Sequence, residues 1–289
     1  MLENMGILAA FGAMLCWGIG DFLIQRSTRR IGNIETIFFI GLLGSLGLLP
    51  FVYSELPSVL SNSNLLMTLF FLGFFTLLSS ATHYKALKIG KLCVVEPILE
   101  LELPITIMFS MLLLSEVLTP LQAILSAAIF AGIMILSLSK RKRMNCSVFE
   151  KGALLAIAAA AVYGFLNFFT GVVARTTSPM LAIWSAWTVC AIICFAYLMK
   201  KRGLAALVND AKKYKGMIIT VSFFDTLSWV FFATAMVSIP ISIATAISES
   251  YPAIAALLGI MVNREMLKNR QFLGMGIALA SSIALALVI

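Results

Sequence analysis

The run from residue 94 to residue 116, VVEPILELELPITIMFSMLLLSE, is apolar enough to cross a lipid bilayer, yet it contains Glu96, Glu100 and Glu102. Each ionised acid at the centre of a spanning helix costs about 2.5 to 3.5 kcal/mol, whereas each leucine or isoleucine returns only about 0.3 to 0.6 kcal/mol. The acids must therefore face a cavity, a partner helix or water rather than lipid. Acids held in this way indicate a functional site, and the alternative is a polar contact that only joins neighbouring helices.

The spacing of these acids puts them on two surfaces of the helix. Glu96 and Glu100 are four residues apart and share a face, whereas Glu102 lies about 200° round from Glu100, at roughly 100° per residue. Pro97 and Pro104 stand beside the acids. They either interrupt the helix at a binding site or simply kink it.

The hydrophobic content of the whole chain defines its class. The 289 residues are 61% hydrophobic and 12% charged, against roughly 25% charged in soluble domains. Ten apolar runs approach the ~20 residues that a spanning helix needs. The runs are 5–25, 34–54, 64–84, 92–114, 120–139, 152–174, 179–199, 216–237, 241–262 and 270–289. We therefore predict an all-α integral membrane protein with ten transmembrane helices and no soluble domain.

The basic residues predict the orientation in the membrane. Twenty of the 21 lysines and arginines follow odd-numbered runs, and only Arg175 follows an even-numbered one. Short loops rich in lysine and arginine remain in the cytoplasm. Both termini are therefore expected on the outer side of the plasma membrane, which is the inner membrane in a bacterium. The net charge of +8 then serves topology and contacts with membrane lipids, and not nucleic-acid binding.

The two halves of the chain resemble each other. The stretch CWGIGDF that begins at Cys16 aligns with VYGFLNF 146 residues later, which places Trp17 on Tyr163 and Asp21 on Asn167. Further along, matches recur at an offset of 149 in the same order. Ordered matches of this kind predict an internal repeat with five helices in each copy.

The second set of matches concerns the acids. At the offset of 149, Glu100 falls on Glu249 and Glu102 on Tyr251. Five spans per copy is an odd number, so the second copy enters the membrane from the opposite side, giving inverted repeats. Glu100 and Glu249 then lie at similar depth, roughly 12 Å into their helices. We predict that they meet near the midplane, where secondary transporters bind substrates and coupling ions.

At this point the sequence resembles a known family, the EamA branch of the drug/metabolite transporter superfamily. The resemblance rests on LCWGIGDF, VYGFLNF and YKALKIG, and on the related stretches LPITIMFSMLLLSEVLTPLQ and YPAIAALLGIMVNREMLKNRQ. It covers nearly the whole chain, as a first five-helix repeat over 1–143 and a second over 144–289. It implies secondary transport of small metabolites, often amino acids or amines, through a central cavity. The chain departs from the family pattern in its density of acids before Pro104, so the resemblance assigns those acids no role.

The predicted spans hold acids without matching bases. The acids are Asp21, Glu96, Glu100, Glu102, Asp225 and Glu249. No lysine or arginine lies clearly away from a span end, so protons, coupling cations or a cationic substrate must balance the acids.

Aromatic residues accompany these acids at helical spacing. Trp17 is four residues before Asp21, and Trp229 is four after Asp225, so each pair shares a helix face. A carboxylate beside aromatic faces suits an ammonium group, although Trp and Tyr also mark the membrane interface. The predicted substrate-binding residues are Trp17, Asp21, Glu100, Tyr163, Asn167, Trp229, Glu249 and Tyr251.

Acids near the midplane also suit proton coupling. A carboxylic acid in a low-dielectric site, with a like charge nearby, holds its proton more readily than one in water. Such an acid releases its proton when a cation enters and regains it afterwards. We assign this role first to Glu100 and Glu249, with Glu96, Glu102 and Asp225 as further candidates.

Cofactor and enzyme chemistry find little support. The five cysteines show no CxxC spacing, and the single histidine, His83, lies near the end of the third run. We expect no metal, disulfide or cofactor, and interpret His83 as structural. A serine with a plausible base is also lacking. The sequence leaves two transport hypotheses, a proton-linked carrier of a small organic cation or zwitterion, and an exporter of neutral or anionic metabolites in which the acids serve only coupling. A membrane enzyme or scaffold is disfavoured.

Overall fold

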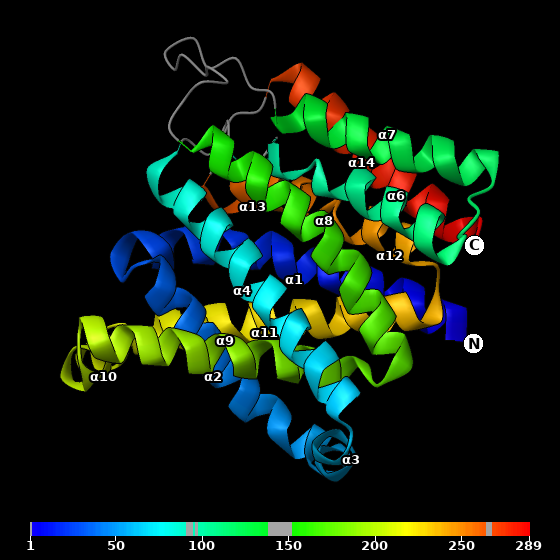
Figure 1. Cartoon of the computed structure of the whole chain (residues 1–289). Coiled ribbons are helices and arrows are strands. Elements are labelled where there is room, and N and C mark those ends of the chain that lie inside the picture. Colours follow the sequence, from blue (N-terminus) through cyan, green and yellow to red (C-terminus); the bar gives the residue numbers. More distant parts are fainter. Residues whose placement is uncertain (1, 91–94, 96–97, 138–151, 264–267) are drawn as a thin grey trace.

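A computed structural model of the chain describes residues 2–90, 95, 98–137, 152–263 and 268–289. Within these ranges every regular element is a helix (Figure 1). Nine helices of the described part are long and apolar enough to cross a membrane. They are α1 (Leu2–Arg30), α2 (Asn33–Val52) with its short extension, α4 (Ser63–Ile89), α7 (Pro120–Ser137), α8 (Ala153–Thr176), α9 (Pro179–Lys201), α11 (Lys215–Ser238), α12 (Ile241–Ser248) leading into α13 (Tyr251–Asn263), and α14 (Asn269–Leu287). The predicted all-helical integral membrane class is confirmed.

Shorter elements complete the described chain. The apolar helix α6 (Glu102–Leu114) lies in the fourth predicted run. The extension of α2 consists of η1 (Tyr53–Glu55) and α3 (Leu56–Ser61), and α10 (Leu204–Lys213) connects α9 to α11. Local signals set these boundaries: the side chain of Asn62, for example, accepts hydrogen bonds from the backbone N of Asn64 at 3.1 Å and of Leu65 at 3.2 Å, which caps α4.

Two helical segments are interrupted at acids. A turn at Glu100 and Leu101 precedes α6, and a turn at Glu249 and Ser250 separates α12 from α13. The two turns are 149 residues apart, the same offset at which the sequence repeats. Pro104 lies in the first turn of α6, where the missing N–H costs no intrahelical bond. It therefore follows the interruption rather than kinking a continuous helix, while Pro97 lies outside the described residues.

The helices pack mainly across the two predicted halves. α1 lies against α11, α2 against α9, α4 against α8 and α7 against α14. Glycines allow the closest approach: a Cβ atom added at Gly132 of α7 would lie 2.8 Å from the carbonyl oxygen of Gly274 of α14. Small residues of this kind let membrane helices touch backbone to backbone. The halves are thus interleaved in one bundle.

The ends of the bundle differ in charge. Both termini lie at one end, which we call the terminal end (Figure 1). The helices α1, α4 and α9 finish at the other end, which we call the basic end (Figure 1). Their last turns carry lysine or arginine: Arg29 and Arg30 in α1, Lys88 in α4, and Lys200 and Lys201 in α9. Arg175, in the last turn of α8, is a basic residue at the terminal end.

Candidate functional site

A cavity lies in the middle of the bundle, where the two interrupted helical segments meet α1, α4, α8 and α11. It holds about 420 Å³ of space outside protein atoms, open solvent included. Its lining residues are the acids Asp21, Glu102, Asp225 and Glu249, the aromatic residues Trp17, Tyr84, Tyr163, Trp229 and Tyr251, and Ile24, His83, Leu99 and Asn167. Among these lining residues of the described chain there is no lysine or arginine.

The aromatic lining residues Trp17, Tyr84, Tyr163, Trp229 and Tyr251, together with His83, form what we call the aromatic wall. Trp17 contacts two of its other rings. Its ring centroid lies 5.3 Å from that of Trp229, edge to face, and 6.2 Å from that of Tyr251. Tyr163 lies nearly parallel to Trp229, with centroids 6.4 Å apart. Four helices, α1, α8, α11 and α13, therefore each contribute a ring. The aromatic residues predicted from helical spacing are brought together at one site.

Two of the lining acids, Glu102 and Glu249, lie next to each other. Glu102 is the first residue of α6, Glu249 directly follows α12, and their side chains hydrogen-bond to each other. Two carboxyl groups need a proton between them to form such a bond. Asn167 of α8 also donates from Nδ2 to Oε1 of Glu249 at 3.3 Å. Both glutamates are buried: 6% of Glu102 and 3% of Glu249 is exposed.

Contacts between α6 and α8 hold Glu102 in place. The hydroxyl of Thr106 donates to the carbonyl oxygen of Glu102 at 2.9 Å and to that of Gly164 at 3.0 Å. Gly164 has no side chain, so α6 approaches α8 directly: an added Cβ would lie 2.4 Å from Cγ2 of Ile105. The position of Glu102 in the cavity thus depends on a close helix contact.

A second pair of acids lies on the other helices. Asp225 of α11 is buried, and Asp21 of α1 is half-buried and close enough for their charges to interact. Each is four residues from a tryptophan of the aromatic wall, Trp17 or Trp229. The cavity therefore receives carboxyl groups from α1, α6, α11 and the turn after α12.

The acid that lines the cavity with Glu249 is Glu102, whereas the internal repeat predicts Glu100 as the partner of Glu249. Glu100 is buried in the turn before α6 and is not among the residues that line the cavity. The reason is the interruption: α6 begins at Glu102, and this residue, rather than its neighbour in the turn, projects toward Glu249. Glu96 lies outside the described residues.

His83 and Tyr84 are lining residues that the sequence analysis missed. The His83 ring centroid lies 5.7 Å from that of Tyr163, edge to face, and the Tyr163 hydroxyl lies 3.4 Å from that of Ser80. Because α4 continues to Ile89, His83 is well inside the helix and not at its end. The sequence signal for this part of the wall is that His83 and Tyr84, two polar aromatic residues, stand within a continuous helix.

The arrangement suits a small positively charged group. Carboxylates supply counter-charge, and aromatic faces attract a cation by roughly 0.5 to 2 kcal/mol.

Comparison with known proteins agrees with a membrane carrier. The sequence matches the EamA-like transporter family over residues 4–138 and again over residues 150–287. It is similar in fold to a protein of known crystal structure, with a TM-score of 0.74 and 16% sequence identity, over 99% of this chain and 96% of that chain. At this identity the likeness concerns the fold alone. No curated protein matches the sequence.

Proposed function

Because the chain belongs to the EamA-like transporter family, we propose that it is a secondary transporter of a small organic cation or zwitterion, such as choline, another amine or an amino acid. Family membership makes it a membrane transporter of the drug/metabolite type, and the family is one of transporters and not of enzymes. We propose three further properties: the class of substrate, the coupling of transport to protons, and the preference of the cavity for a positively charged group.

The lining of the central cavity carries the proposal. Four acids surround the aromatic wall, and no lysine or arginine among the described residues faces them. An anionic substrate entering this site would be repelled unless all four acids were protonated. An ammonium group would gain a counter-ion and an aromatic face at the same time.

Proton coupling follows from the contact between Glu102 and Glu249. A cation that binds beside this pair makes the shared proton unfavourable, and the pair regains the proton when the cation leaves. Substrate and proton therefore exchange at one place, which couples the two fluxes. Asp225 is a further candidate for this role. Glu100, which the internal repeat pairs with Glu249, is the alternative to Glu102 as the partner of Glu249.

We further propose that the chain crosses the plasma membrane ten times, as two inverted repeats over 1–143 and 144–289, with both termini outside. The turns at Glu100–Leu101 and Glu249–Ser250 stand at repeat-equivalent positions, and the family matches the chain twice. The basic helix ends share one end of the bundle. Alternating access around the cavity between the repeats would then move the substrate.

A binding comparison tests the charge preference directly. Choline and 3,3-dimethylbutan-1-ol have the same shape, but only choline is charged. We expect choline, or another amine or amino acid in a panel, to raise the unfolding temperature of the purified protein more than its uncharged isostere. If dicarboxylates or sugar phosphates stabilise the protein and no amine or amino acid does, the acids serve coupling alone and the proposed substrate class is wrong.

A further inference from the structure

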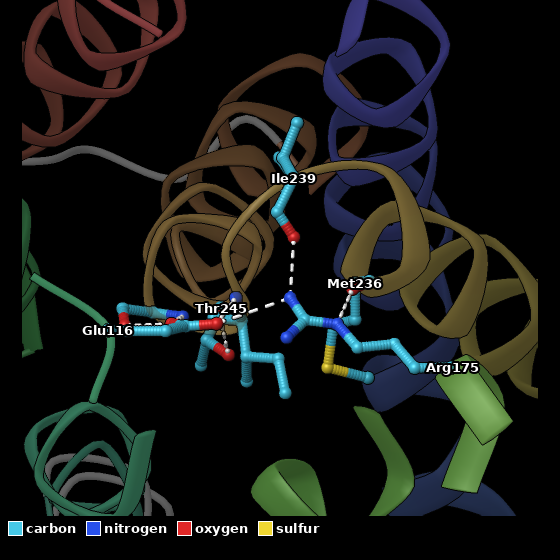
Figure 2. A network of polar contacts seen from close by, with 7 residues as sticks. Glu116, Arg175, Met236, Ile239 and Thr245 are labelled. Carbon is cyan, nitrogen blue, oxygen red and sulfur yellow. Dashed lines mark hydrogen bonds and ion pairs between the residues drawn. The ribbon is translucent and has the colours of Figure 1, made fainter. Parts of the chain in front are cut away.

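A polar network joins α8, α11 and α12 to the connection between α6 and α7 (Figure 2). Glu116 stands at its centre, in the connection between α6 and α7. Its Oε1 accepts from Nη2 of Arg175 at 3.2 Å and from the backbone N of Ile241 at 2.9 Å. Its Oε2 accepts from the backbone N of Ser242 at 3.1 Å and from the Ser242 hydroxyl at 2.6 Å. The carboxylate thus caps the N-terminus of α12.

Arg175 binds the other side of the same connection. Its Nε donates to the carbonyl oxygen of Met236 at 2.7 Å, and its Nη2 donates to that of Ile239 at 3.0 Å. These carbonyls belong to the end of α11 and the residue after it, where intrahelical donors run out. The guanidinium therefore lies at the negative end of α11, and the carboxylate of Glu116 at the positive end of α12. Each charge is held by a helix terminus as well as by the other charge.

The backbone is closely packed around this network. A Cβ added at Gly171 of α8 would lie 2.5 Å from Cδ1 of Ile241 and 3.0 Å from Sδ of Met236, and one at Gly6 of α1 would lie 2.7 Å from Cβ of Ser238. There is no room for an additional methyl group between these helices.

The joined helices lead from the network to the cavity. α12 begins at Ile241, beside the network, and has eight residues, or about 12 Å. Glu249 directly follows its last residue and lines the cavity. On α8, Asn167 lies eight residues before Arg175 and donates to Glu249. A shift of the network therefore moves both partners of that hydrogen bond.

We propose that Glu116 and Arg175 are positioning residues of the transport cycle. They form a clamp that closes the cavity toward the terminal end and holds Glu249 in place through α12. Release of the clamp opens the cavity to that end. The inference rests on the proposed transport function, because alternating access requires the cavity to open at each end in turn.

Opening is measured by the reaction of an introduced cysteine with a membrane-impermeant methanethiosulfonate reagent. Thr170 is 1% exposed, lies on α8 between Asn167 and Arg175, and lines a small cavity beside Trp229, so Thr170→Cys reports whether the reagent reaches the bundle interior from this end. The reagent is added from the side of the termini, which a C-terminal tag identifies. We expect Glu116→Gln or Arg175→Gln to raise the labelling rate about tenfold, because charge-assisted hydrogen bonds of the closed state are lost. Peptide mass spectrometry assigns the label to position 170.

A second cysteine separates opening from general loosening. Ile24 is 2% exposed, lines the cavity and lies nearer the basic end of α1. In the Ile24→Cys background, the reagent is added from the opposite side of the membrane. Adding Glu116→Gln or Arg175→Gln should slow this labelling, because a protein that spends more time open at the terminal end spends less time open at the basic end. Faster labelling at both positions would show a loosened protein and overturn the proposal.

Glu55 provides the matched control. Its Oε1 accepts from the Ser178 hydroxyl at 2.9 Å, also between the two halves at the terminal end, and the residue takes no part in the network around α11 and α12. Glu55→Gln should leave both labelling rates within about twofold of the parent. If Glu116→Gln gives the same rates as Glu55→Gln, the clamp does not exist. The assay contains no substrate, so a failure of the proposed substrate class leaves its result unchanged.

A charge swap distinguishes a helix-terminal clamp from a simple ion pair. In the double variant Glu116→Arg with Arg175→Glu the ion pair can form again, but each charge faces a helix terminus of its own sign. We therefore expect labelling at position 170 to stay fast. Slow labelling in the double variant would mean that the ion pair alone closes this end, contrary to the assignment.

Discussion

The side chains of Glu102 and Glu249 meet in the central cavity although the two residues are not at equivalent positions in the internal repeat. Glu249 corresponds to Glu100, and Glu102 corresponds to Tyr251. The contact is therefore asymmetric: one interrupted segment contributes the residue of its turn, and the other contributes the first residue of its following helix. The proposed proton coupling uses this pair, because two neighbouring carboxyl groups can share a single proton.

Glutamine substitutions test the roles of these acids. Glu102→Gln and Glu249→Gln should each abolish uptake driven by a pH gradient in proteoliposomes, because glutamine keeps a hydrogen-bonding amide but holds no exchangeable carboxyl proton. Glu100→Gln is the matched comparison and should retain pH-dependent uptake, since Glu100 does not line the cavity. Loss in Glu100→Gln alone would restore the repeat-equivalent pairing. Retention in both cavity variants would make those acids structural.

The contact between α6 and α8 predicts a stability effect. A Cβ at Gly164 would lie 2.4 Å from Cγ2 of Ile105 and 3.1 Å from the carbonyl oxygen of Glu102. Gly164→Ala should lower the free energy of unfolding by about 1 to 3 kcal/mol through overpacking, and should weaken amine binding because α6 shifts. Gly47 of α2 has no atom within 4 Å of its added Cβ, so Gly47→Ala should cost nothing. Equal unfolding temperatures for the two variants in detergent would contradict this account of the contact.

Much of the bundle and of the aromatic wall follows from spacing. Apolar runs of membrane-spanning length define the helices, and an i, i+4 relation places Trp17 with Asp21 and Trp229 with Asp225. Such relations hold wherever a helix is continuous. They therefore predict the cavity residues of α1 and α11, which remain helical through the site.

Helical spacing fails where the helix stops. The helix is interrupted by a turn at Glu100 and Leu101. The angle of roughly 100° per residue therefore does not apply between Glu100 and Glu102, and it cannot predict which of these acids enters the cavity. The contact of Glu116 with Arg175 joins residues 59 positions apart, so no local spacing in the sequence could reveal it. Trp187, which no acid accompanies at helical spacing, is buried and lines a small separate cavity with Trp229. Burial against a distant helix leaves no periodic signal.

Topology provides a test that is independent of the substrate. Twenty of the 21 basic residues follow odd-numbered runs, so reporters fused after Ile289 and inserted within residues 140–143 should report opposite sides of the membrane. An alkaline phosphatase reporter should be active at Ile289, and a fluorescent protein that folds only in the cytoplasm should be active in the insertion. A cytoplasmic C-terminus would overturn both the count of ten spans and the orientation.

Trp17 tests whether the cavity selects positive charge. Its ring lies within 5.3 Å of Trp229 and 6.2 Å of Tyr251, centroid to centroid, and it lines the cavity beside the acids. Trp17→Ala removes packing for any ligand, but it removes electrostatic attraction only for a cation. We expect choline, or the amine found in the binding screen, to lose roughly 2- to 30-fold more affinity than its uncharged isostere, the equivalent of about 0.5 to 2 kcal/mol.

Two further variants make the Trp17 comparison specific. Trp17→Phe keeps a ring with a weaker negative face, so its loss of amine affinity should be intermediate. Trp184 is half-buried on α9 and does not line the cavity, so Trp184→Ala should change neither ligand's affinity. Equilibrium binding to the purified protein gives all the ratios. If Trp17→Ala weakens choline and the isostere equally, Trp17 contributes packing alone, and the charge preference must then come from the carboxyl groups without the ring.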